Sequence, residues 1–140
     1  MWRILILTLL LLPSAFAEKR VIWPKEFPAG TPFSPGVLVE GTLYVAGQTG
    51  QNLATKQIPD DFETEVKQTF DNIGIVLKAV GMNYQDVVAV QVYLTDMTLF
   101  QRMNGVFTQY FKEPKPARTT VGVAKLVGTA RIEVTVTAHK

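Results

Sequence analysis

Two charged residues late in the chain, Arg118 and Glu133, have the types and the setting expected of a ligand site. Each lies in a stretch of alternating residues that is typical of a β-strand. If helices cover the valine-rich faces of these strands, alternation places both charged side chains on the opposite face, partly desolvated and available to a ligand. The same pattern also fits an ordinary surface ion pair, worth about 0–1 kcal/mol.

The amino-acid composition limits the kinds of functional site that the chain can form. His139 is the only histidine and cysteine is absent, so neither a histidine-based catalyst nor a His/Cys metal centre has enough ligands. The formal net charge is +2, and no basic run is longer than Lys19-Arg20. A chain with this charge and no basic cluster lacks the positively charged surface that is typical of nucleic-acid-binding proteins. Without disulfides, stability must come from burial, to which association with further copies of the chain can add.

Hydrophobic periodicity predicts the helices and strands that position Arg118 and Glu133. Apolar residues recur at helical spacing from Phe62 to Val80, after the acidic pair Asp60-Asp61 and before Gly81, a good helix stop. A second helix is predicted over 99–111, before two prolines. Strands are predicted over 20–23, 36–40, 42–46, 87–94, 118–125 and 132–138.

This order of elements predicts an α+β fold, a mixed β-sheet with two helices packed on one face. The opposite face would carry Arg118 and Glu133 together with Thr120, Thr135 and Thr137. Small and β-branched residues of this kind suit a packed interface between subunits better than open water. The pattern therefore predicts a partner on the face without helices.

The N-terminal segment 1–17 has the pattern of a cleavable signal peptide. Arg3 precedes an apolar run from Ile4 to Leu12, and an Ala-x-Ala site ends at Ala17. The run is shorter than the about 20 residues that span a bilayer, so no membrane association is expected after cleavage. We expect a periplasmic or secreted protein consisting of one domain, residues 18–140.

Short motifs along the whole of this domain resemble the Rid/YjgF family of reactive-intermediate (imine/enamine) deaminases. The most specific are Pro116-Ala117-Arg118-Thr119-Thr120-Val121 and Ile132-Glu133-Val134. The other matching segments are 32–36, 43–48, 68–73, 93–97 and 103–104. Their order and spacing make the resemblance specific.

The resemblance implies a chorismate-mutase-like protomer, a homotrimer, and ligand clefts between subunits that take a small-molecule carboxylate. It implies hydrolysis of 2-imino or 2-enamino acids to 2-keto acids and ammonia, with no cofactor and no metal. By resemblance, Arg118 anchors the substrate carboxylate, for which a planar bidentate donor is needed, and Glu133 activates water. The implied substrate-binding positions are Phe33, Gly47, Asn104 and Thr120. For Asn104, a plain helix-surface amide fits equally well.

Two positions depart from the family pattern. Phe33 stands where members usually carry Tyr, and Ala46 where they usually carry Ser. Two hydroxyl groups are therefore missing, and the cleft should be more apolar than in the family. The alternative function is a non-catalytic trimer that binds keto or carboxylic acids in the cell envelope. Ribonuclease activity, which is sometimes ascribed to the family, is disfavoured by the near-neutral charge.

Overall fold

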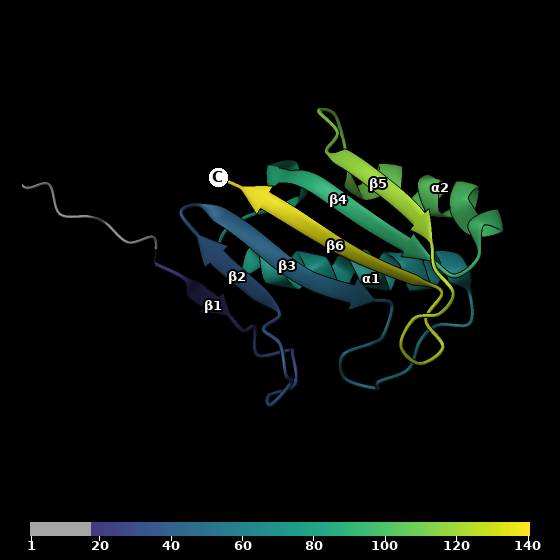
Figure 1. The fold of residues 1–140 in the computed structure, drawn as a ribbon, viewed down its shortest axis with the longest axis horizontal. Helices are drawn as coiled ribbons and strands as arrows, with labels where there is room; N and C mark the ends of the chain where they lie inside the picture. Colours follow the sequence, from purple (N-terminus) through teal and green to yellow (C-terminus); the bar gives the residue numbers. More distant parts are fainter. Residues whose placement is uncertain (1–17) are drawn as a thin grey trace, which may run out of the picture.

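The computed structural model describes residues 18–140. The predicted signal peptide, residues 1–17, lies outside the described residues. Figure 1 shows one sheet with two helices beside it. The helices are α1 (Phe62–Lys78) and α2 (Phe100–Tyr110), with two short 3-10 turns at Tyr84–Asp86 and Met97–Leu99. The strands are β1 (Arg20–Ile22), β2 (Gly36–Val39), β3 (Thr42–Thr49), β4 (Val87–Leu94), β5 (Ala117–Gly122) and β6 (Ile132–His139).

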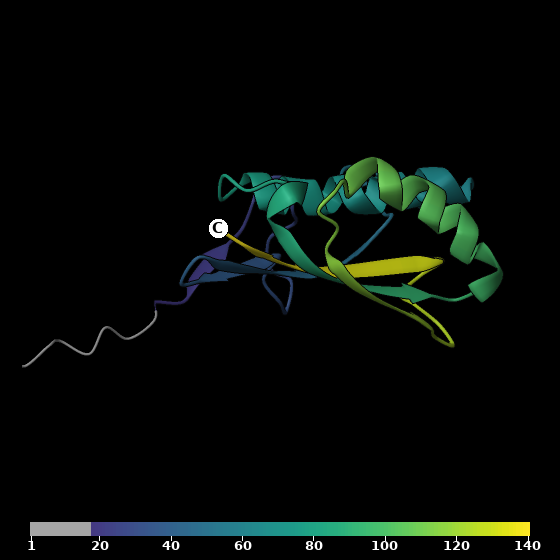
Figure 2. The same ribbon diagram turned by 90° about the horizontal axis from the view of Figure 1, so that it is seen from above.

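The sheet is mixed, and both helices pack on one of its faces. Its six strands follow the order β1-β2-β3-β6-β4-β5. Neighbours are antiparallel except for the parallel pair β4 and β5. Seen edge-on in Figure 2, α1 and α2 lie together on one side of the sheet. The predicted α+β class and the placement of both helices are confirmed.

Local sequence determines where α1 begins and ends. Asp61 caps its first turn, because its carboxylate accepts hydrogen bonds from the backbone N–H and the hydroxyl of Thr64, at 2.8 and 2.7 Å. These hydrogen bonds, that of the hydroxyl first, hold the pKa of Asp61 below its ordinary value. After the helix, Gly81 takes a φ of 72°, which side chains rarely tolerate. The acidic start and the glycine stop seen in the sequence therefore both delimit the helix in the structure.

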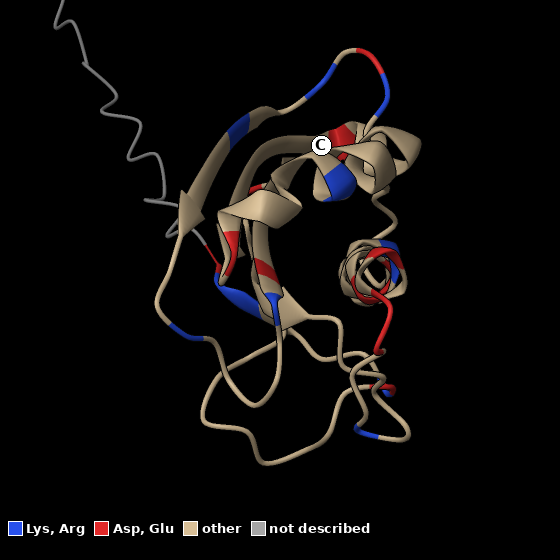
Figure 3. Ribbon diagram, turned by 90° about the vertical axis from the view of Figure 1, so that its right-hand side faces the viewer, with Lys and Arg blue, Asp and Glu red and all other residues tan. Residues whose placement is uncertain are grey.

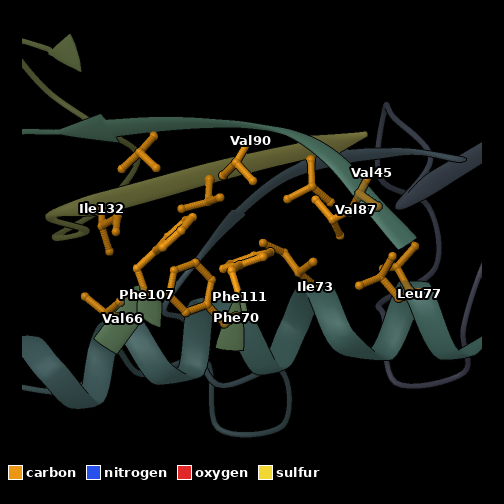
Figure 4. Packing of buried hydrophobic residues seen from close by; sticks show 14 of the residues in the cluster. Val45, Val66, Phe70, Ile73, Leu77, Val87, Val90, Phe107, Phe111 and Ile132 are labelled. Atoms are coloured by element: carbon orange, nitrogen blue, oxygen red, sulfur yellow. The ribbon is translucent and has the colours of Figure 1, made fainter. Parts of the chain in front are cut away.

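The core lies between the helices and the sheet. Figure 4 shows Phe70, Phe107 and Phe111 in contact below the valines of the strands. Phe107 and Phe111 stack with their ring centroids 4.4 Å apart, and Phe70 meets both edge-on. Such aromatic pairs contribute about 0.5–1.5 kcal/mol each beyond their buried area. The aromatic group therefore fixes α2 against α1.

The face assigned to β5 from alternation was wrong. Arg118 pairs with the buried Val90 and Thr120 with the buried Val92, so both point to the helix side. Val121 pairs with Tyr93, which also pairs with Glu133, so these three side chains share the face without helices. Alternation gives two faces but not which one is covered. The apolar residue Val121 marks the open face, where it is 41% exposed.

The open face of the sheet carries small side chains and exposed apolar or aromatic ones. Among the residues described, no helix covers this face (Figure 2). Tyr44 is 53% exposed on it, and the half-buried Ala46, Thr135 and Thr137 lie nearby. Exposed apolar surface of this kind marks an interaction surface. Within 18–140, no helix is long and apolar enough to cross a membrane.

Candidate functional site

Glu133 lies in a hollow on the open face of the sheet. The hollow has a volume of about 350 Å³ and is lined by Phe33, Ala46, Gly47, Thr49, Val127 and Glu133. Within the described part of the chain, Glu133 has no hydrogen-bond or ion-pair partner for its carboxylate. Phe33 is 56% exposed and Val127 82%. Such exposure of apolar walls indicates that the hollow is not closed by this chain alone.

The backbone of Gly47 supports the Glu133 carboxylate. A Cβ atom at position 47 would lie 2.0 Å from Oε1 of Glu133, well inside any allowed contact. The register of β3 against β6 shifts between Val45 and Gln48, at a β-bulge that includes Gly47. The bulge and the missing side chain together let the carboxylate rest against the strand. A side chain at position 47 would therefore displace the flexible end of Glu133 from its place against the strand.

Arg118 lies on the other face, at the edge of the sheet. Its guanidinium lies 4.5 Å from the ring centroid of Phe107 and 5.6 Å from that of Phe100. Stacking on aromatic rings holds the group in place and leaves the N–H groups at its rim free to bind. No carboxylate within 18–140 pairs with it. Partial burial lowers the pKa of Arg118, because desolvation disfavours the charged form.

Asn104 and Thr120 belong with Arg118. Asn104 precedes Phe107 by one helical turn and follows Phe100 by another, so it shares the side of α2 that meets the guanidinium. Thr120 points to the same face of β5 as Arg118. Both side chains are half-buried. The predicted site residues thus form two groups, an arginine group (Arg118, Thr120, Asn104) and a glutamate group (Glu133, Gly47, Phe33).

The two groups are separated within one chain. Arg118 pairs with Val90, which pairs with Val136 on β6. Arg118 is therefore two strands away from Glu133 and three residues along the strand, about 14 Å between Cα atoms at ordinary strand spacing. The two side chains also point to opposite faces. A small molecule cannot contact both Arg118 and Glu133 of the same chain.

The other charged residues in the described part of the chain form no second candidate site. Figure 3 shows Lys and Arg scattered over separate elements rather than gathered in a stripe. Within the described ranges, no three His, Asp or Glu residues lie close enough together to hold a metal ion. The unpaired Arg118 and Glu133 are therefore the chemically competent groups that the geometry offers.

Three contributors were not found from the sequence. Thr49 and Val127 line the hollow, and Phe107 carries the guanidinium of Arg118. Helical spacing identified Phe107 as a core residue, which it is, at 5% exposure, but spacing does not show which strand residue it meets. Val127 lies in the loop between β5 and β6, where no periodic signal exists.

Comparison with known proteins gives consistent matches. The family model described as endoribonuclease L-PSP matches residues 24–140. A 2-iminobutanoate/2-iminopropanoate deaminase of Capra hircus is 39% identical over 118 residues, covering 83% of this chain and 86% of that protein. A RutC family protein of Aquifex aeolicus is 37% identical over 115 residues, covering 81% of this chain and 91% of that protein.

Solved structures agree with these matches. The crystal structure of RidA from an Antarctic Psychrobacter species superimposes with a TM-score of 0.82 at 33% identity. The match covers 86% of this chain and 99% of that one. The similarity therefore extends over most of the chain.

Proposed function

Since the chain belongs to the endoribonuclease L-PSP (Rid/YjgF) family, we propose that it hydrolyses 2-imino acids to 2-keto acids and ammonia. Relatives named 2-iminobutanoate/2-iminopropanoate deaminase at 37–39% identity support this activity. The observation that carries the proposal is the pair of unpartnered groups, an arginine and a glutamate, each held in place by its own neighbours.

The reaction needs a carboxylate anchor and a base for water. Arg118 binds the substrate carboxylate through two N–H groups. Glu133 takes a proton from a water molecule as the oxygen adds to the C=N carbon, which gives a carbinolamine. Glu133 returns this proton to the nitrogen, then takes the hydroxyl proton of the carbinolamine and delivers it to the amino group, so that the C–N bond breaks and ammonia leaves as the C=O bond forms. No redox step is involved, and the elements of one water molecule are consumed.

The proposed site is composite, built from two copies of the chain. Arg118 lies at the edge strand β5 and Glu133 on the open face, so the arginine group of one copy can approach the glutamate group of the next. This contact joins two different surfaces, and three such contacts can close a ring. The exposed Tyr44 and Val121 on the open face support burial by partner subunits. We therefore propose a homotrimer with three sites.

Phe33 and Ala46 line the proposed cleft without hydroxyl groups. In this site, the positioning of water therefore depends on Glu133, on the hydroxyl of Thr49 and on backbone groups. A chain that only bound the 2-keto acid would keep Arg118 but gain nothing from Glu133. Comparing Arg118 and Glu133 variants in binding and in turnover separates the two functions.

The direct test generates 2-iminopropanoate from alanine with an amino-acid oxidase and follows the loss of the imine after addition of residues 18–140. We expect faster loss than in buffer. No acceleration, together with Arg118-dependent binding of 2-ketobutyrate, would overturn hydrolysis in favour of binding. RNA cleavage that survives Arg118→Ala would point to a different activity.

Gly47→Ala is expected to lower kcat for 2-iminopropanoate by about 100-fold, the typical effect of a catalytic group displaced by about 1 Å. The new methyl group occupies the place of the Glu133 carboxylate, while the backbone groups of residue 47 remain. The control is Gly105→Ala, where a Cβ atom meets nothing within 4 Å. Equal activity of the two variants would remove Glu133 from the proposed chemistry.

A further inference from the structure

A second cavity adjoins the hollow that holds Glu133. It has a volume of about 200 Å³ and shares three lining residues, Phe33, Gly47 and Thr49, with that hollow. Its apolar walls come from the N-terminal arm and from the loop after β3, through Phe27, Pro35 and Leu53. The two spaces therefore have a common wall, formed by Phe33 and the end of β3, beside the proposed reaction centre.

The side-chain amides that line this cavity already donate hydrogen bonds within the protein. Asn72, on its floor, donates to the carbonyl oxygens of Thr49 and Gln51 at 3.0 and 2.9 Å and accepts from Gln68 at 2.9 Å. The amide of Gln51 donates to the carbonyl oxygen of Lys56. Burying an apolar group in a polar pocket usually costs free energy, because donors that line the pocket lose their partners. Here these donors keep their partners when an apolar group fills the cavity.

The size of the cavity fits a bulky side chain. An apolar protein cavity of about 150 Å³ is sufficient for benzene, so this one has room for a phenyl or a branched aliphatic group. Lys56, at the cavity, is exposed and can keep its ammonium in water while its aliphatic stem lies along the rim. A methyl group, as in 2-iminopropanoate, would leave most of the space unfilled.

We propose that this cavity receives the side chain of the substrate and selects 2-imino acids with large apolar side chains, branched or aromatic. This inference rests on the proposed function and adds the substrate class. With the imine carbon beside Glu133, the side chain enters the cavity past Gly47 and Phe33. Phe33, where the family pattern has Tyr, then acts as an apolar wall between the reaction centre and the cavity.

The test compares imines made in situ from leucine, phenylalanine and alanine. We expect kcat/KM for the two larger imines to exceed that for 2-iminopropanoate by at least about tenfold, since one methylene in an apolar pocket already changes specificity by about 10- to 200-fold. Leu53→Trp fills the cavity and is expected to abolish this preference, because it lowers kcat/KM for the two larger imines far more than that for 2-iminopropanoate. The control is Ala54→Trp, in the same turn but outside the cavity lining.

The outcomes separate the two proposals. Turnover of 2-iminopropanoate without a preference for larger imines overturns the specificity inference alone. A preference that Leu53→Trp and Ala54→Trp affect equally also overturns it, because the cavity would then not be the selecting element. Absence of turnover with all three imines overturns the proposed function, and this inference with it.

Discussion

Arg118→Ala is expected to lower kcat/KM for 2-iminopropanoate by about 100- to 1,000-fold, the cost of removing one partner from a desolvated charge pair. The guanidinium of Arg118 is half-buried on Phe107 with no carboxylate partner in residues 18–140. Desolvation lowers the pKa of Arg118, yet arginine stays charged at neutral pH. A substrate carboxylate restores the interactions that the group lost on burial.

Most of this loss should appear in KM, because the anchor binds substrate and transition state alike. Arg118→Lys should recover only part of it, since an ammonium neither stacks on Phe107 in the same way nor binds two oxygens at once. Arg20→Ala, at an exposed arginine of β1, is the control and should match wild type. Steady-state kinetics at several imine production rates measures both parameters. Unchanged kcat/KM in Arg118→Ala would show that Arg118 does not anchor the substrate carboxylate.

Arg131→Met is expected to lower the free energy of unfolding by about 3–5 kcal/mol, the cost of leaving a buried charge without its partner. Glu65, on α1, is fully buried and accepts from the backbone N–H and from Nε of Arg131, at 2.7 and 2.6 Å. The same guanidinium donates to the carbonyl oxygens of Pro59 and Asp60. Arg131 therefore joins the loop before α1 to the start of β6.

The double variant Glu65→Leu/Arg131→Met should be much more stable than Arg131→Met, because it removes the unpaired carboxylate as well. Urea unfolding at fixed protein concentration gives the three free energies, with concentration held constant because an oligomer gains stability by mass action. A loss below about 1 kcal/mol in Arg131→Met would mean that Glu65 keeps enough hydrogen bonds without Arg131.

The sequence was sufficient where one physical signal acted alone. Helix α1 was predicted because an apolar stripe, an acidic start and Gly81 agree, and strands β4 and β6 because one face of each is fully buried. Strand β5 was harder, because it lies at the sheet edge and neither of its faces is buried. Its alternation therefore did not show which face the helices cover, and Arg118 was assigned to the wrong one.

The resemblance named candidate site residues but not their arrangement, and it did not name Thr49, Val127 or Phe107 as contributors. The resemblance pointed to Arg118, Glu133, Phe33 and Gly47, and the structure brings the last three together at one hollow. The contact of Arg118 with Phe107 depends on tertiary packing that no local pattern reports. The signal peptide and the roles of the site residues stay predictions.

Arg118 of one chain works with Glu133 of another in the proposed site, and mixing two impaired variants tests this most directly. At imine concentrations well below KM, Arg118→Ala and Glu133→Gln are each expected to retain at most about 1% of wild-type activity alone. After joint unfolding and refolding in equal amounts, about a quarter of all sites pair an intact Arg118 with an intact Glu133, which corresponds to one of the three sites in every mixed trimer.

Native mass spectrometry should show three chains per particle and particles that contain both variants. We expect activity to return to about a quarter of the wild-type value. The double variant Arg118→Ala/Glu133→Gln mixed with Arg118→Ala contains no intact Arg118 and should stay inactive. Mixed trimers that form but show no activity would contradict a site shared between chains.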